Sequence, residues 1–316
     1  MQLTEYLNKD ETLFSFEVLP PLKGKSIDSL FKAIDPLMEC KPAFVDVTYH
    51  REEYILKERP DGGYDKISKR KRPGTVAICA ALKNKYQVET VPHLICGGFS
   101  KDDTENALID LNFLGIQNVL AIRGDNQKDE RNFTPEPNGN ANALELIRQI
   151  DDMNKGIYLD KELENSTQTN FCIGAAGYPE KHIDAPNMSS DMRFLKQKVD
   201  AGAEFITTQM FFDNKKYFEY VENCRAAGIH VPIIPGIKPI TKKAHMYALP
   251  KIFNIDLPDD LASALENAKD DKTARQIGIE WCIDQCKELK KANVPVLHFY
   301  TMSFSSATKE IVSKIF

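Results

Sequence analysis

Short apolar runs recur along this chain, and a segment with helical periodicity follows almost every one of them. Eight of these runs are expected to form strands, at residues 14–18, 44–49, 91–96, 118–122, 171–179, 205–209, 231–237 and 294–301. Helices are expected at 26–37, 75–86, 100–114, 144–150, 189–199, 218–224, from 241, from 258, at 273–292 and at 306–315. About eight strand-then-helix units in 316 residues predict an α/β fold of the (β/α)8 TIM-barrel type.

A doubly wound open sheet is the alternative fold for alternating strands and helices. Such a sheet usually carries a glycine-rich phosphate-binding turn after its first strand, whereas here the first strand runs into EVLPP, residues 17–21. The sequence contains neither a P-loop nor a dinucleotide-binding fingerprint. The barrel is therefore the better prediction, and we expect residues 1–316 to form a single domain.

The composition excludes several classes of protein. A formal net charge of -5 argues against nucleic acid as the main partner, because phosphate binding requires a basic face. No apolar stretch approaches the roughly 20 residues of a membrane span, and the first residues do not have the pattern of a signal peptide. Seven scattered cysteines without a C-x-x-C pair favour free thiols in a reducing compartment. We therefore expect a cytoplasmic protein.

One stretch departs from the alternation of strands and helices. Residues 51–73 are highly charged and contain the basic run Lys69-Arg70-Lys71-Arg72. Such a run is more often a solvated surface than a nucleic-acid site. We expect this charged insertion in the barrel to be a solvent-exposed loop.

Residues at the ends of the predicted strands carry most of the candidate chemistry. In a parallel barrel they line one mouth, which is where ligands bind. They are Glu17, Thr48, His93, Arg123, Asp125, Tyr178, Gln209, Lys238 and Tyr300.

Glu17 is the most informative of these residues. It has the opposite parity to Phe14, Phe16 and Val18, so its side chain should point inside the barrel or across its mouth. A buried carboxylate without a partner has a raised pKa and can hold a proton near neutral pH, as a general acid requires. A Glu paired with Lys or Arg inside the barrel explains the same position equally well.

Arg123, Gly124 and Asp125 place a cation, a flexible backbone and a carboxylate directly after the fourth strand. Gly-Asp is also ordinary turn chemistry, so the tripeptide alone favours a turn over a site. Gln209 has two interpretations as well. Its amide could contact the edge of a heterocycle, or it could satisfy the backbone of the following loop.

A metal site is not expected. His93 lies near a strand end, but the other candidate ligands His182, His245 and His298 are on separate segments. A hydrogen-bonding role for His93 is therefore a better prediction than metal ligation.

Several longer motifs together resemble the 5,10-methylenetetrahydrofolate reductase family. They are FSFEVLPP, FVDVTY, PHLIC, NVLAIRGD, AAGYPEKH, LKQKVDAGAEFITTQMFFD, IIPGIKPI and HFYT. They occur in the family's order and at its spacings and cover nearly the whole chain. The ordered set is therefore far more specific than any one motif.

The resemblance implies a flavoprotein barrel without a separate nucleotide-binding domain. Members of the family reduce 5,10-methylenetetrahydrofolate to 5-methyltetrahydrofolate in one-carbon metabolism and methionine biosynthesis. Their electrons usually come from NADH or NADPH and pass through bound FAD in a ping-pong sequence. The implied partners are therefore a folate and a pyridine nucleotide, and a homo-oligomer remains an open expectation.

The family's site residues carry over to the matching positions of this sequence. Glu17 matches the general acid that opens the folate aminal to an iminium, and Asp125 matches the carboxylate that stabilises this cation beside flavin and pterin. Gln209 matches an amide that contacts the pterin or the nicotinamide. The positions that match FAD contacts are Thr48, His93, Arg123, Gly124, Asp125, Ala141, Tyr178, His182, Ala185, Asp191 and Lys198.

The sequence departs from the bacterial pattern at several of these places. His245 stands where a Gln contacts substrate, Leu249 where a Phe stacks on folded nicotinamide cofactor, and Phe304 where an Arg follows HFYTLN. Further replacements near the flavin are Asn140, Phe194 and Gln197. The departures leave the preferred nucleotide open. No regulatory extension follows the barrel, so control by S-adenosylmethionine is not expected.

Two other functions fit a flavin barrel. One is oxidation of another cyclic amine, as in a proline-dehydrogenase-like protein. The other is a flavin- or folate-binding subunit whose electrons come from a partner protein. Reduction of the flavin by NADH or NADPH separates the reductase from both.

Overall fold

The predicted (β/α)8 barrel is confirmed by the computed structural model, which describes residues 1–7, 11–126, 130, 132–302 and 305–316. Within these residues eight parallel strands close in the order β1-β10-β9-β8-β7-β6-β5-β2. Their bounds are β1 Leu13–Val18, β2 Phe44–Val47, β5 Glu89–Ile95, β6 Asn118–Ile122, β7 Cys172–Gly177, β8 Ala203–Met210, β9 Ile233–Ile237 and β10 Val296–Tyr300.

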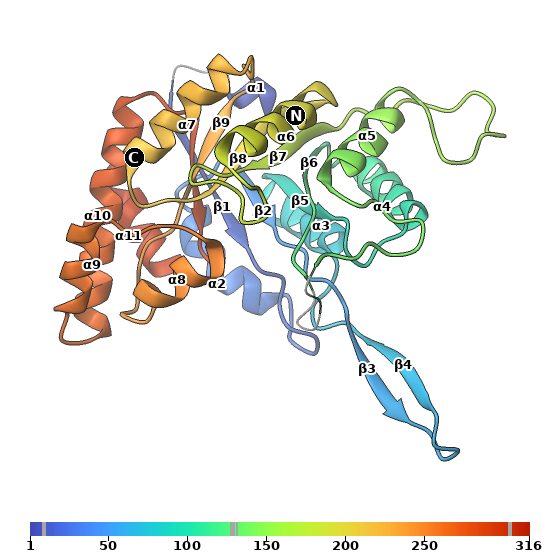
Figure 1. Ribbon diagram of the computed structural model, residues 1–316, viewed down its shortest axis with the longest axis horizontal. Helices are drawn as coiled ribbons and strands as arrows, with labels where there is room; N and C mark the ends of the chain where they lie inside the picture. Colours follow the sequence, from blue (N-terminus) through green and yellow to red (C-terminus); the bar gives the residue numbers. More distant parts are fainter. Residues whose placement is uncertain (8–10, 127–129, 131, 303–304) are drawn as a thin grey trace.

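Helices surround this barrel on the outside (Figure 1). They are α1 Thr4–Leu7, α2 Asp28–Met38, α3 Thr75–Tyr86, α4 Lys101–Phe113, α5 Ala143–Asn154, α6 Met188–Asp200, α7 Asn214–Ala226, α8 His245–Phe253, α9 Asp259–Glu266, α10 Asp271–Lys291 and α11 Ser305–Ile315. The expected helix from residue 241 begins four residues later, at His245. None of the described helices is both long and apolar enough to cross a membrane.

The helix boundaries follow local chemistry. Ser100 and Asp103 form a capping box at the start of α4, because each side chain accepts a hydrogen bond from the other's backbone N–H. Asn187 caps α6 in a similar way by accepting from the N–H of Ser190. Gly202, with φ 118°, follows the end of α6 and turns the chain into β8.

An apolar layer closes the amino-terminal end of the barrel interior. It contains residues of the N-terminal segment together with inward-facing residues of the strands: Leu3, Leu7, Phe44, Val91, Leu120, Cys172, Phe205, Ile234 and Val296. A larger apolar cluster, which includes Phe16 and Val18, packs the outer face of the strands against the helices. The polar groups of the interior therefore lie above the closed end, toward the carboxyl-terminal ends of the strands.

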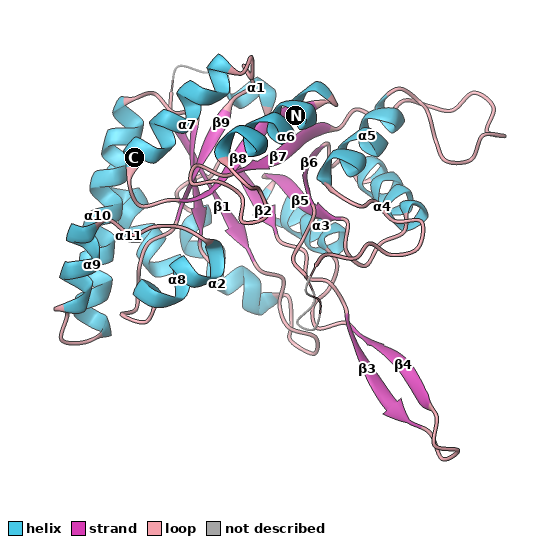
Figure 2. Cartoon of the chain, viewed as in Figure 1, coloured by secondary structure: helices cyan, strands magenta, loops and turns pink. Residues whose placement is uncertain are grey.

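The charged insertion is a β-hairpin, so the prediction of a loop at residues 51–73 was wrong. Strands β3 (Glu53–Glu58) and β4 (Tyr64–Lys69) pair antiparallel, and the hairpin projects away from the barrel (Figure 1, Figure 2). Gly62 has φ 82°, as a tight hairpin turn requires. Cross-strand pairs such as Ile55 with Ile67 stabilise the strands. The many charged residues of the segment suggested a loop and obscured the pattern of its two strands.

The closed end of the barrel leads to a stability prediction. Leu3 is fully buried, whereas Leu56 on the hairpin is 70% exposed. Leu3→Ala should lower the free energy of unfolding by about 2–4 kcal/mol, because it leaves a cavity in a packed layer. Leu56→Ala should change it by less than about 0.5 kcal/mol. Urea unfolding followed by circular dichroism measures both, and equal effects would contradict the packing role of Leu3.

Candidate active site

Five polar side chains from four strands meet inside the barrel. His93 Nε2 lies 3.2 Å from Asp46 Oδ2 and 4.0 Å from Glu17 Oε2. His298 Nε2 lies 3.9 Å from the same Asp46 oxygen, and its Nδ1 is 2.7 Å from Ser15 Oγ. We call Ser15, Glu17, Asp46, His93 and His298 the polar cluster.

The register of the strands builds this cluster. Glu17 on β1 pairs with Asp46 on β2, and Ser15 pairs with His298 on β10. All of these side chains alternate with apolar residues that face the helices, as the parity of Glu17 predicts. The expectation that Glu17 points into the barrel is therefore confirmed.

Burial shifts the proton equilibria of the polar cluster. The pKa of Glu17 is raised to about 7, first by burial and also by the charge of Asp46, although His93 and Lys238 act in the opposite direction. Burial alone would lower the pKa of His93, but its hydrogen bond to Asp46 and the two carboxylate charges raise it. Burial lowers the pKa of His298. Glu17 is thus able to hold a proton near neutral pH.

The sequence left open whether Glu17 is paired with a cation. Among the described residues Glu17 forms no ion pair with a lysine or arginine, and its charged neighbour is His93. Lys238 on the β9 side donates instead to the carbonyl oxygen of Tyr300 at 2.9 Å. Burial lowers the pKa of Lys238 to about 8, and the charge of Glu17 partly offsets this.

Gln209 lies at the end of β8 and Tyr300 at the end of β10, with β9 between the two strands. The Gln209 amide oxygen accepts a 2.9 Å hydrogen bond from the N–H of Met210, which is the backbone contact considered as one alternative. The Tyr300 hydroxyl donates to the carbonyl of Thr208 at 2.6 Å. Its ring lies against Gly236, where a Cβ would collide with both Tyr300 and the Thr208 carbonyl.

The segment after β6 holds a cation at the rim of the barrel. Arg123 Nη1 is 2.6 Å from Asp184 Oδ2. Gly124 has φ 84°, and a Cβ there would lie 3.1 Å from Cβ of Ile95, so the backbone passes close to β5. Asp125 is exposed and lies outside the polar cluster. The tripeptide therefore combines a tight backbone turn with an accessible carboxylate.

The segment between β7 and α6 brings several predicted residues together. The rings of Tyr178 and His182 meet edge to face with centroids 4.6 Å apart. The backbone N–H of His182 donates to Asp191 Oδ2 at 2.8 Å, and Lys198 Nζ donates to the carbonyl of Ala176 at 3.0 Å. Burial lowers the pKa of Lys198 to about 8, with the charge of Asp191 acting against it. These contacts assemble cationic and aromatic groups beside the barrel mouth.

The remaining candidates have simpler surroundings. The Thr48 hydroxyl donates to the carbonyl of Val18 at 3.2 Å. Ala141 is exposed, and its N–H donates to Glu145 Oε2 at 2.9 Å. Ala185 is buried and its carbonyl accepts from Lys181.

The residues that depart from the bacterial pattern have different surroundings. His245 begins α8, and its Nδ1 accepts from the N–H of Thr241 at 3.4 Å. Leu249 is buried in an apolar cluster with Met210, rather than exposed at the mouth. Phe304 lies outside the described residues.

Sequence reasoning missed three members of the polar cluster. Ser15 and Asp46 were not singled out, and His298 was considered only as a metal ligand. A carboxylate at position 46, inside the apolar run FVDV, is the signal that could have found the cluster. The described residues contain no group of three or more His, Cys, Asp or Glu side chains able to hold a metal ion.

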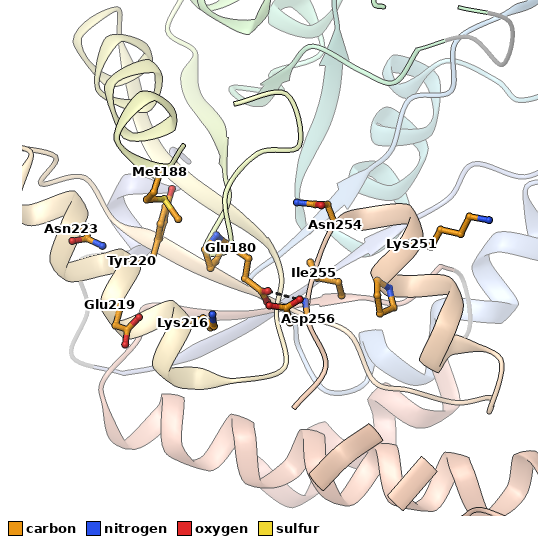
Figure 3. Close-up of a pocket in the computed structure, with 12 residues that line it drawn as sticks. Glu180, Met188, Lys216, Glu219, Tyr220, Asn223, Lys251, Asn254, Ile255 and Asp256 are labelled. Carbon is orange, nitrogen blue, oxygen red and sulfur yellow. Dashed lines mark hydrogen bonds between the residues drawn. The ribbon is translucent and has the colours of Figure 1, made fainter. Parts of the chain in front are cut away.

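Two cavities are lined almost entirely by residues that do not belong to the polar cluster. One of about 750 Å³ is formed by the β7–α6 segment, α7 and the end of α8, and the N–H of Asp256 donates to Glu180 Oε2 at 2.8 Å at its wall (Figure 3). Burial raises the pKa of Glu180 to about 7. The other cavity, of about 600 Å³, lies between α3 and α4 and includes His93 in its wall.

Comparison with known proteins decides the family. A family model described as Methylenetetrahydrofolate reductase matches residues 2–315. The chain belongs to the methylenetetrahydrofolate reductase family. The resemblance inferred from the ordered motifs is thereby confirmed.

Individual relatives in this reductase family cover the chain differently. "Methylenetetrahydrofolate reductase (NADH) 1" of Arabidopsis thaliana is 32% identical over an alignment of 315 residues that covers 96% of this chain and 48% of the plant protein. The "5,10-methylenetetrahydrofolate reductase" of Pectobacterium carotovorum is 28% identical over 295 residues, 92% of this chain and 85% of that protein. The chain thus spans about half the length of the eukaryotic relatives it matches.

A solved structure shares the fold of this methylenetetrahydrofolate reductase family chain. It is that of an uncharacterized protein from Clostridium thermocellum that binds two copies of 5-methyl-5,6,7,8-tetrahydrofolic acid. The two chains superpose with a TM-score of 0.61 at 10% identity, over 100% of this chain and 99% of the other. At this identity the comparison supports the barrel fold alone.

The raised pKa of Glu17 makes folding depend on pH. The ordinary pKa is 4.5 and the folded value is about 7, so the folded protein binds the extra proton and its stability falls as pH rises between these values. Glu17→Gln removes this loss. The variant should exceed the parent protein in stability by about 1–3 kcal/mol near pH 8 and by much less near pH 5.

Chemical denaturation at the two pH values measures this difference. Glu58→Gln on the exposed hairpin is the control and should give the same small effect at both. A Glu17→Gln effect that does not change with pH would mean that Glu17 is ionised throughout.

Proposed function

We propose that this chain catalyses the FAD-dependent reduction of 5,10-methylenetetrahydrofolate to 5-methyltetrahydrofolate, with NADH or NADPH as the electron donor. The observation that carries the proposal is Glu17, a nearly buried carboxyl inside the barrel whose pKa is raised to about 7. Membership of the reductase family and the name of the plant relative support the same reaction and a pyridine nucleotide donor.

Glu17 acts as the general acid in this proposal. Opening the five-membered aminal ring of the folate requires a proton on one nitrogen as the carbon–nitrogen bond breaks. Glu17 supplies that proton, and the ring opens to an iminium cation. The apolar layer below the polar cluster keeps bulk water away from that side of the acid.

Asp125 stabilises the cation that this step produces. It is an exposed carboxylate at the end of β6, on the same barrel mouth as Glu17. An anion that is fixed before the reaction lowers the energy of a positive charge that develops beside it. Glu17 and Asp125 thus have complementary roles, one as a proton donor and the other as a fixed anion.

The residues around the mouth fit the charge of FAD. Arg123 and the partly buried Lys198 offer positive charge to a diphosphate, and the turn at Gly124 brings the backbone close to β5. Tyr178 and His182 offer ring surface beside them. Bound FAD supplies the hydride-transfer chemistry, and the protein supplies orientation and electrostatics.

An anaerobic titration tests the proposal as a whole. The purified protein, loaded with FAD, is mixed in turn with NADH, NADPH and methyltetrahydrofolate while flavin absorbance is followed. We expect reduction by at least one nucleotide and by methyltetrahydrofolate, because the reaction is reversible through the same flavin. Reduction by a cyclic amine such as proline instead, or by none of the three, would overturn it.

Glu17→Gln should separate the two halves of the reaction. The variant should retain flavin reduction by the nucleotide, because no acid acts in that half. Its turnover of methylenetetrahydrofolate should fall by roughly 10²–10⁴-fold. Glu204→Gln is the matched control, since burial also raises the pKa of Glu204 but β8 carries it outside the polar cluster. Retained turnover would remove Glu17 from the acid role.

Asp125→Asn tests the electrostatic role at the rim. Folate reduction should slow more than flavin reduction by the nucleotide, by about tenfold or more, because a fixed charge beside the cation is lost. Stopped-flow measurement of the two half-reactions gives the comparison directly. Equal slowing of both would indicate that Asp125 supports the turn rather than the chemistry.

A further inference from the structure

Asp46 is a buried carboxylate that has no role in the reaction proposed above. It is 1% exposed, and its Oδ1 has no hydrogen-bond partner among the residues that the structure describes. Its Oδ2 lies between two imidazole nitrogens, at 3.2 Å from His93 and 3.9 Å from His298. A buried charge persists only when an opposite charge or hydrogen bonds compensate it. The two histidines are the compensating groups within reach.

The two histidines are not equivalent in this respect. His93 hydrogen-bonds Asp46 and faces a second carboxyl, Glu17, at 4.0 Å from the same Nε2 atom. His298 is beyond hydrogen-bonding distance of Asp46 and is held by Ser15 at its other nitrogen. Geometry therefore selects His93 as the residue that carries the positive charge. The direction of the pKa shifts agrees, upward for His93 and downward for His298.

We propose that Asp46 is a positioning residue that holds His93 as an imidazolium beside Glu17. The proposal rests on the proposed reductase function for the identity of the proton acceptor. In the acid step the proton moves from the Glu17 carboxyl to a substrate nitrogen, and Glu17 becomes a carboxylate. The His93 cation stabilises that carboxylate, so Asp46 sets the strength of the acid without touching the substrate.

Other titratable groups also face this part of the barrel. They are Lys238 on the β9 side, His298 and Tyr300 on β10, Cys79 on α3, and His50 after β2. Of these, Lys238 acts on Glu17 in the same direction as His93, but its effect is smaller than that of His93. The positive charge that Asp46 controls is therefore the stronger one.

Asp46→Asn tests the proposal because it keeps the shape of the side chain and removes its charge. His93 then loses its counter-charge and becomes neutral. Glu17 loses a nearby cation, which outweighs the loss of the Asp46 anion, so its pKa should rise by about one unit. Infrared difference spectra of the full FAD-loaded protein, referenced to Glu17→Gln, follow the protonated Glu17 carbonyl band against pH.

The matched control is Thr207→Val. Thr207 is buried, and its hydroxyl has no hydrogen-bond partner among the described residues, so the nearly isosteric change leaves the polar cluster intact. Its Glu17 titration should match that of the parent protein. A Glu17 midpoint in Asp46→Asn that also matches the parent would overturn the proposal.

A second measurement uses the unsubstituted chain and so does not depend on whether Asp46→Asn folds. Nitrogen-15 spectra of histidine-labelled protein distinguish imidazolium from neutral imidazole, and His93→Gln assigns the signal. We expect one imidazole, that of His93, to stay cationic above the ordinary histidine pKa of 6.5 while His298 is neutral. A His93 imidazole that is already neutral just above pH 6.5 would overturn the proposal. Neither measurement uses turnover, so failure of the reductase function would be seen separately.

Discussion

Closure of the barrel over an apolar layer is the constraint from which the chemistry of this chain follows. Phe44, Leu120, Phe205 and their neighbours fill one end of the interior, with Leu3 of the N-terminal segment packed beneath them. Polar side chains placed above that layer have little access to water on that side, so they must compensate one another. Proton equilibria in the interior are therefore set by neighbouring side chains.

Two carboxyl groups in the same interior have acquired different properties for this reason. Asp46 is hydrogen-bonded to the His93 imidazole at 3.2 Å, whereas Glu17 is 4.0 Å from the same nitrogen, and burial is the largest cause of its raised pKa. The same imidazole therefore hydrogen-bonds one carboxyl group and faces the other beyond hydrogen-bonding distance.

The sequence was sufficient to predict the barrel and the inward direction of Glu17, because both depend on local periodicity. It was insufficient for the polar cluster, since the proximity of Asp46 and His298 depends on the register of β2 and β10 against β1. Register is decided by the packing of the whole barrel, which no local pattern encodes. The hairpin at residues 51–73 was missed for the opposite reason, because its local signal was present but its charge suggested a loop.

Two cationic side chains, Arg123 and Lys198, lie near the mouth of the barrel and differ in their surroundings. Arg123 is already paired with Asp184, whose carboxylate is more than half exposed. An anionic ligand that binds Arg123 can displace that carboxylate into solvent. The arginine then exchanges one anion for another, so its positive charge is compensated both before and after binding. Lys198 differs, because it is partly buried and its ammonium contacts the neutral carbonyl of Ala176. An anion arriving beside Lys198 would restore the charge that burial disfavours, and ligand binding and lysine protonation should therefore strengthen each other.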